Sequence, residues 1–117
     1  MGYRFILGGN IQGFGPARLD ELGPRLAEDR ITDRDGRPLG FYDDWDRDGV
    51  MEVCLHYVSP DSQAWRTLLL DNISHVVDEF AIDGYFLDQT FCFFSDPRHN
   101  HYRGVRELIL ELRRRHP

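Results

Sequence analysis

The stretch DGYFLDQ at residues 83–89 decides the fold that this sequence predicts. It opens with the turn dipeptide Asp83-Gly84, continues with three aromatic or aliphatic residues, and reaches Asp88 directly after them. A short apolar run between turn signals is typical of a buried strand. We therefore expect a strand over residues 85–88, with the Asp88 carboxylate at the border between the core and solvent.

The residues before this strand predict a second strand and a long helix. Residues 51–57 alternate between apolar and polar side chains, which is the period of a strand. Ser59 and Pro60 are typical of a helix start, with Ser59 as the N-cap, and apolar residues continue at helical spacing as far as Phe80. A strand, helix and strand in this order predict a parallel, right-handed unit.

The two ends of the chain extend this pattern to an α/β fold. An apolar strand over residues 3–7 stops at two glycines, and residues 102–112 carry the spacing of a last amphipathic helix. We expect a single partial (β/α)-barrel segment over residues 1–117, with about three parallel strands, two main helices and an irregular insertion at about 10–50. A complete barrel of this type takes about 250 residues, so this chain can supply only part of one.

The insertion contains local signals of its own. Leucines over residues 16–28 predict short helical turns, and Asp35-Gly36 predicts a small hairpin. The spacing of Asp44, Asp46 and Asp48, with a glycine next, matches the start of a calcium loop. The twelfth position of that loop should be a bidentate Glu but is Leu55, so a complete EF-hand is excluded. A solvated turn and a partial calcium site both remain as interpretations.

Composition limits the class of protein. The chain has 117 residues and a formal net charge of -6, which argues against nucleic acid and against an anionic membrane as partners. Its two cysteines, Cys54 and Cys92, lack the CxxC spacing of a zinc site, and we expect free thiols in a reducing compartment. With no signal-peptide pattern and no apolar run of about 20 residues, a cytoplasmic protein is expected.

Polar residues at the predicted strand ends form the candidate site. Ligands of parallel α/β folds bind beyond the carboxyl ends of the strands, and this chain places chemistry-bearing side chains there. Asp88 is the candidate nucleophile or general base. The expected substrate-binding residues are Asn10, Gln12, Trp45, His56, Tyr57 and Gln89.

Each of these residues also has a structural interpretation. Asp88 could cap the next segment, His56 could be a satisfied structural histidine, and Trp45 could cover the core instead of stacking on a sugar ring. His99 and His101 lack the helical spacing of a metal pair, so we expect no metal and no other cofactor. A small metal-dependent hydrolase that uses Asp88 and these histidines remains an alternative of lower rank.

The order of these motifs resembles the middle of a glycoside hydrolase (β/α)8 barrel. The resemblance rests on a strand that ends in Gly-Gly-Asn, the run HYVSP at 56–60, Trp65-Arg66 and the run DGYFLDQ at 83–89. They are similar to the retaining α-glucosidase and α-galactosidase group and to uncharacterised glycosidase-like barrels with an L-D-Q-T sequence. The resemblance implies that Asp88 takes the place of the catalytic nucleophile, while His56 stands where the family has an Asp.

We therefore expect a fragment of a carbohydrate-active hydrolase. Such enzymes use two carboxyl groups, and in the resembling families the general acid comes from a later strand. The chain begins on a strand and ends after a helix, so we expect the segment to be inactive alone. The alternative is a non-catalytic remnant of such a barrel that binds carbohydrate or associates with itself. The expected partners are a carbohydrate and either a second copy of the chain or the remainder of the barrel.

Overall fold

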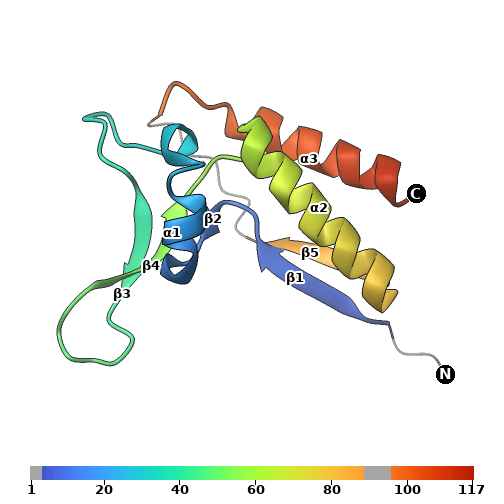
Figure 1. The fold of residues 1–117 in the computed structure, drawn as a ribbon, viewed down its shortest axis with the longest axis horizontal. Coiled ribbons are helices and arrows are strands. Elements are labelled where there is room, and N and C mark those ends of the chain that lie inside the picture. The colour runs from blue at the N-terminus through green and yellow to red at the C-terminus, as the bar shows by residue number, and fades with distance from the viewer. Residues whose placement is uncertain (1–3, 89–95) are drawn as a thin grey trace.

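The computed structural model describes residues 4–88 and 96–117, and it has a mixed α/β architecture (Figure 1). A two-stranded parallel sheet and a three-stranded antiparallel sheet lie side by side, and the described strands do not close into a barrel. Among the described residues, no helix is long and apolar enough to cross a membrane. The elements in chain order are β1 (Ile6–Asn10), β2 (Gly13–Phe14), η1 (Pro16–Arg18), α1 (Leu19–Leu22), η2 (Ala27–Asp29), β3 (Gly40–Asp43), β4 (Glu52–Tyr57), α2 (Gln63–Phe80), β5 (Gly84–Asp88) and α3 (His101–Arg115).

The expectation of about three parallel strands is wrong for β4. Only β1 and β5 pair in parallel, whereas β4 lies between β2 and β3 and runs antiparallel to both. This antiparallel pairing explains why apolar and polar residues alternate along β4. Parallel strands are covered on both faces and read as continuous apolar runs, whereas alternation is typical of an antiparallel strand with one solvated face.

Strand β1 runs through the glycines at which the sequence predicted its end. A Cβ atom on Gly9 would clash with the Tyr85 hydroxyl, and a Cβ on Gly8 would lie 3.1 Å from the Phe86 ring. The glycines therefore let β1 and β5 pair closely while the two rings pack against the bare backbone. At the amino end of this pair, Phe5 N–H donates to the Asp83 carboxylate at 2.8 Å, which ties the turn before β5 to the start of β1.

The two long helices lie side by side over one face of the parallel sheet (Figure 1). Helix α2 begins later than expected, because its N-cap is Ser62, whose hydroxyl accepts the Trp65 N–H at 3.1 Å. The predicted N-cap, Ser59, instead accepts the Asp61 N–H within the preceding turn. Helix α3 is capped by Asn100 in the same way as α2 is by Ser62.

The core lies where the two sheets meet the helices. Trp65 of α2 donates its indole N–H to the Ile11 carbonyl at 2.8 Å, which fixes the helix to the link between β1 and β2. Strand β4 ends beside the same link, because Val58 N–H donates to the Gln12 carbonyl at 2.7 Å. The buried apolar cluster comprises Ile11, Phe14, Leu22, Leu26, Val58, Trp65, Leu69, Leu70 and Leu108.

The region at about 10–50 is more ordered than an irregular insertion. It supplies β2 and β3 to the antiparallel sheet, and its short helical turns form as expected. The predicted hairpin is confirmed by the bridge between Thr32 and Pro38, with Gly36 at a φ of +80° in the turn. This part of the chain therefore forms a layer of its own beside the parallel sheet.

Candidate functional site

The carboxyl ends of β1 and β5 bring Asn10 and Asp88 together. The two residues are directly opposite each other in the register of the parallel pair, and Ile11 N–H donates to the Asp88 carbonyl at 3.3 Å just beyond them. The Asn10 side-chain oxygen accepts the Gln12 N–H at 2.8 Å, which fixes the orientation of the amide. Asp88 is exposed and Asn10 is half-buried, so this edge presents a carboxylate beside a carboxamide.

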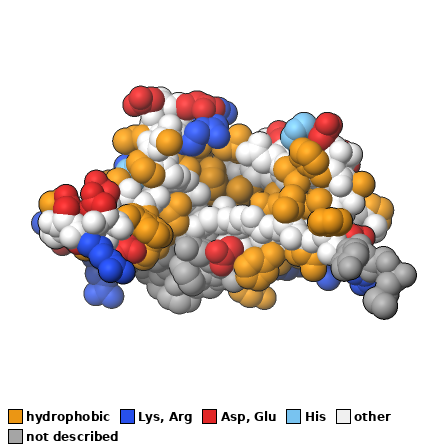
Figure 2. Space-filling view, turned by 90° about the horizontal axis from the view of Figure 1, so that it is seen from below, with side chains coloured by type: hydrophobic (Ala, Val, Ile, Leu, Met, Phe, Trp, Pro, Cys, Tyr) orange, Lys and Arg blue, Asp and Glu red, His pale blue; other side chains and the backbone are white. Residues whose placement is uncertain are grey.

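The sheet face that carries this pair also carries Phe86. Residues that are two apart on a strand point to the same face, so Phe86 shares a face with Asp88, and Ile6 shares it with Asn10. Phe86 is 61% exposed and Ile6 is 66% exposed. Figure 2 shows hydrophobic side chains gathered over this part of the molecule. The opposite face, through Leu87, packs against the core below the helices.

His56 lies in the other sheet and is built into the structure. It is 8% exposed, its Nδ1 lies 3.0 Å from the Arg30 guanidinium, and its ring packs against Phe14 at 5.3 Å between centroids. Burial, and then the positive charge of Arg30, lowers the pKa of His56. These contacts agree with a neutral, buried histidine, but not with a fully satisfied one, because its Nε2 is buried with no hydrogen-bond partner among the described residues.

Three more of the predicted binding residues are either buried or far from the open face of the β1–β5 sheet. Gln12 is fully buried, and Tyr57 is 9% exposed, with its pKa raised by burial. Trp45 is 69% exposed on the loop between β3 and β4. This loop lies at the end of the molecule opposite to the C-terminal ends of α2 and α3 (Figure 1). The structure therefore does not bring Trp45 to the Asn10–Asp88 edge. Gln89, the last predicted binding residue, lies outside the described residues. Of the two cysteines, Cys92 also lies outside them, and Cys54 is half-buried with a free thiol.

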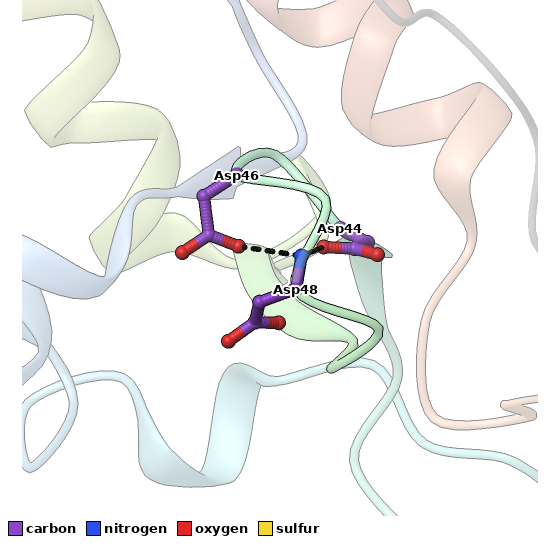
Figure 3. Close-up of side chains that lie close together, drawn as sticks. All are labelled: Asp44, Asp46 and Asp48. Atoms are coloured by element: carbon purple, nitrogen blue, oxygen red, sulfur yellow. Dashed lines mark hydrogen bonds between the residues drawn. The ribbon is translucent and has the colours of Figure 1, made fainter.

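The acidic loop forms the second arrangement of interest. One carboxylate oxygen from each of Asp44, Asp46 and Asp48 lies within 4.8 Å of the others. Figure 3 shows the Asp44 and Asp46 carboxylates turned toward the backbone nitrogen of Asp48. These oxygens also accept backbone N–H groups, because Asp44 accepts from Asp48 at 3.0 Å and from Gly49 at 2.9 Å. The carboxylates thus hold the loop in shape. Among the described residues this is the one group with the spacing of a metal site, and His99 and His101 form none.

Sequence reasoning missed two ion pairs that hold the start of α3. Asp96 is 2% exposed and accepts from Arg98 at 2.7 Å and from Thr32 N–H at 2.9 Å. The Arg98 hydrogen bond lowers the pKa of Asp96 far below its usual range. The Asp61 carboxylate accepts a hydrogen bond from the Arg103 guanidinium at 2.7 Å, and this bond lowers the pKa of Asp61. The partners lie far apart in sequence or within a loop, so no periodic pattern could have shown them.

Phe86 is the functional candidate that the sequence reasoning left in the core. The apolar run at 85–87 favoured burial of all three side chains, but only alternate residues of a strand can face one layer of helices.

Comparison of the chain with protein-family models, with curated proteins and with solved structures gave no match. The function therefore rests on the geometry of this site.

Proposed function

We propose that the open face of the β1–β5 sheet binds a carbohydrate. The observation that carries this proposal is the register of the sheet, which sets Asn10 beside Asp88 and places the exposed ring of Phe86 on the same face. An aromatic face next to polar groups suits a sugar, because the ring takes the C–H face while hydroxyls bond to the polar groups. The carboxylate accepts hydrogen bonds, and the carboxamide both donates and accepts them.

The position of the pair supports a ligand role. Both side chains follow the carboxyl ends of parallel strands, which is where ligands of α/β folds bind. Gly8 adds to this, because a side chain at this position would crowd the Phe86 ring on the same face. The resemblance to glycosidase barrels implies the same residue, Asp88, as a contact to the sugar.

The geometry favours binding over hydrolysis. A glycosidase that works through Asp88 would need a second carboxyl group about 5–9.5 Å from it. The cross-strand neighbour of Asp88 is Asn10, and a carboxamide cannot act as an acid or a base at neutral pH. We therefore propose a carbohydrate-binding module, with Asp88 as a hydrogen-bond acceptor and not as a nucleophile.

Saturation-transfer NMR with methyl α-glucoside, methyl α-galactoside and maltotriose tests the proposal. Phe86→Ala should weaken binding about threefold to tenfold, the range of one aromatic contact. Phe80→Ala is the matched control, because Phe80 is 65% exposed but stands at the end of α2. Equal loss in the two variants, or no transfer from any of the sugars, would overturn the proposal.

The same samples separate binding from catalysis. We expect no release of nitrophenol from 4-nitrophenyl α-glucoside or α-galactoside, either in the wild type or in Asp88→Asn. Turnover that disappears in Asp88→Asn, with the circular dichroism spectrum unchanged, would instead identify the chain as a hydrolase that uses Asp88.

A further inference from the structure

A groove of about 600 Å³ lies between the C-terminal halves of α2 and α3 and the strand β5. Its floor is apolar and includes side chains from all three elements, among them Ile73, Leu87 and Ile109. Ile109 is 37% exposed there, although it belongs to the apolar stripe of an amphipathic helix. An apolar groove that is left open between packed helices and a strand is typical of a binding surface.

Positive charge borders this groove. Arg113 and Arg115 line it, and the one acidic side chain in the lining is Asp83, which is held by Phe5 N–H. Arg115 pairs with Asp71 at 3.0 Å, whereas Arg113 is exposed and makes no ion pair with any residue of the described chain. The rim therefore suits a partner that is apolar in its middle and acidic around it.

The loop between β3 and β4 has this complementary composition. Its carboxylates at Asp44, Asp46 and Asp48 lie within 4.8 Å of one another, and Trp45, which is next to Asp44 and Asp46 in sequence, is 69% exposed. Two further apolar side chains of the same loop are exposed, Val50 at 58% and Met51 at 60%. The loop thus carries exposed apolar side chains beside a cluster of negative charge, with Arg47 as its one basic residue, in a chain whose net charge is -6.

We propose that the Trp45 loop of one copy of this chain docks into the α2–α3–β5 groove of a second copy. Tryptophan is one of the residues enriched among the few side chains that contribute most of the binding energy at protein interfaces, and such side chains fill well-packed pockets. The flanking carboxylates then face the Arg113 side of the rim, which fixes the orientation and excludes the reverse one.

The loop is already shaped for docking. Asp44 accepts N–H groups from Asp48 and Gly49, and Asp48 accepts from Val50 at 2.8 Å. The Trp45 indole N–H donates to the Cys54 sulfur, which links the exposed ring to β4. A segment that is ordered before it binds loses less conformational entropy on docking.

The contact must join two molecules. The molecule measures 49 Å along its longest axis. The loop lies at one end of this axis, and the C-terminal ends of α2 and α3 lie at the other (Figure 1). Figure 2 shows acidic side chains at the loop end. One chain therefore cannot fill its own groove, and the contact is between the head of one copy and the tail of another.

Complementation between two variants tests this docking. Trp45→Ala removes the anchor of the loop, and Ile109→Glu with Arg113→Glu gives the groove the charge of the loop. Each variant alone should raise the dissociation constant of self-association roughly 30-fold or more in sedimentation equilibrium. A 1:1 mixture should regain a dimer, because the intact loop of the groove variant meets the intact groove of the loop variant. Tyr102→Ala is the control, since Tyr102 is 73% exposed away from both surfaces.

The outcomes decide the proposal in each case. A wild type that stays monomeric at millimolar concentration would overturn it. Variants that associate as strongly as the wild type would also overturn it, and would instead indicate pairing through the edges of β1 or β5. Failure of the mixture to regain a dimer would also overturn it. If a variant does not fold, the wild-type indole N–H signals decide. The Trp45 signal should shift with concentration, while that of buried Trp65 stays fixed.

Discussion

The indole nitrogen of Trp65 donates a hydrogen bond to the backbone carbonyl of Ile11, 54 residues earlier in the chain. The two residues are 4% and 1% exposed, so this bond is shielded from water. It joins α2 to the link between the parallel and the antiparallel sheet. Because Asn10 precedes that link directly, the bond also helps to place the candidate binding edge.

Substitution of Trp65 by Phe should therefore destabilise the protein. The ring is largely replaced, but the Ile11 carbonyl is left buried without its donor, which costs about 1–3 kcal/mol of unfolding free energy. Urea unfolding followed by circular dichroism measures this change. Trp45→Phe is the control, since surface substitutions usually change stability by less than about 0.5 kcal/mol. Equal stability of the two variants would contradict the role of the Trp65 bond.

Gly104 allows α3 to pass close to the turn before α2. A Cβ atom at this position would collide with the backbone of Pro60 and Asp61. We expect Gly104→Ala to destabilise the protein by about 1–3 kcal/mol, although alanine favours a helix more than glycine does. Gly15→Ala is the control, because its Cβ would meet only the Cys54 carbonyl oxygen at 3.9 Å. Thermal unfolding of the two variants should separate them, and a stabilised Gly104→Ala would contradict the close approach.

Stability should fall as the pH drops from about 7.5 to 5.5. Burial is the main cause that lowers the pKa of both His56 and His101, with positive Arg30 beside the first and His99 beside the second. Below a pH of about 6.5 the unfolded chain binds protons that the folded chain excludes, so the unfolding free energy decreases. The slope is at most about 1.4 kcal/mol per pH unit for each histidine.

Variants assign this slope to the buried histidines. His56→Gln should flatten the dependence of the unfolding free energy on pH, whereas His75→Gln should leave it unchanged, because His75 is exposed. Urea titrations at several pH values between 5.5 and 7.5 give the comparison. A steep slope that persists in His56→Gln and in His101→Gln would show that other groups cause it.

The Asp96 carboxylate should contribute strongly to stability. Its side chain is buried and accepts from Thr32 and from Arg98, whose own side chain is 48% exposed, so Asp96→Asn should cost about 1.5–3 kcal/mol, the range for hydrogen bonds to charged groups. Its pKa is lowered, so this contribution is complete above a pH of about 4 and is lost as the pH falls further. The deficit of Asp96→Asn relative to the wild type should therefore shrink below pH 4. Asp20→Asn, at an exposed position, should show no deficit at any pH.

Local signals predicted most of the elements but not their assembly into sheets. The period of β4, the helical spacing of α2 and α3 and the turn at Asp35-Gly36 all depend on neighbouring residues, and each element formed. The partner of β4 depends on contacts with β2 and β3, which are distant in sequence or joined by the acidic loop. The predicted N-cap of α2 was Ser59, and the observed one is Ser62. Both serines precede the apolar stripe of the helix, so local sequence alone does not decide which of them caps it.

The candidate site was predicted in part. Asn10 and Asp88 meet as their positions at two strand ends imply, because parallel register needs no further information once the two strands are paired. His56 was placed at the same edge on the assumption of a third parallel strand, and it lies in the antiparallel sheet instead. Phe86 was missed because an apolar run does not show which of its faces the helices will cover.

Mapping of a bound sugar by NMR tests the central proposal most directly. Amide spectra of the labelled protein are recorded during titration with maltotriose and with methyl α-galactoside. We expect the largest shifts at residues 8, 10, 86 and 88, on the open face of the β1–β5 sheet, and the shifts should vanish in Phe86→Ala. Shifts centred on the Trp45 loop or the α2–α3–β5 groove, or no shifts at saturating sugar, would contradict the proposed carbohydrate site.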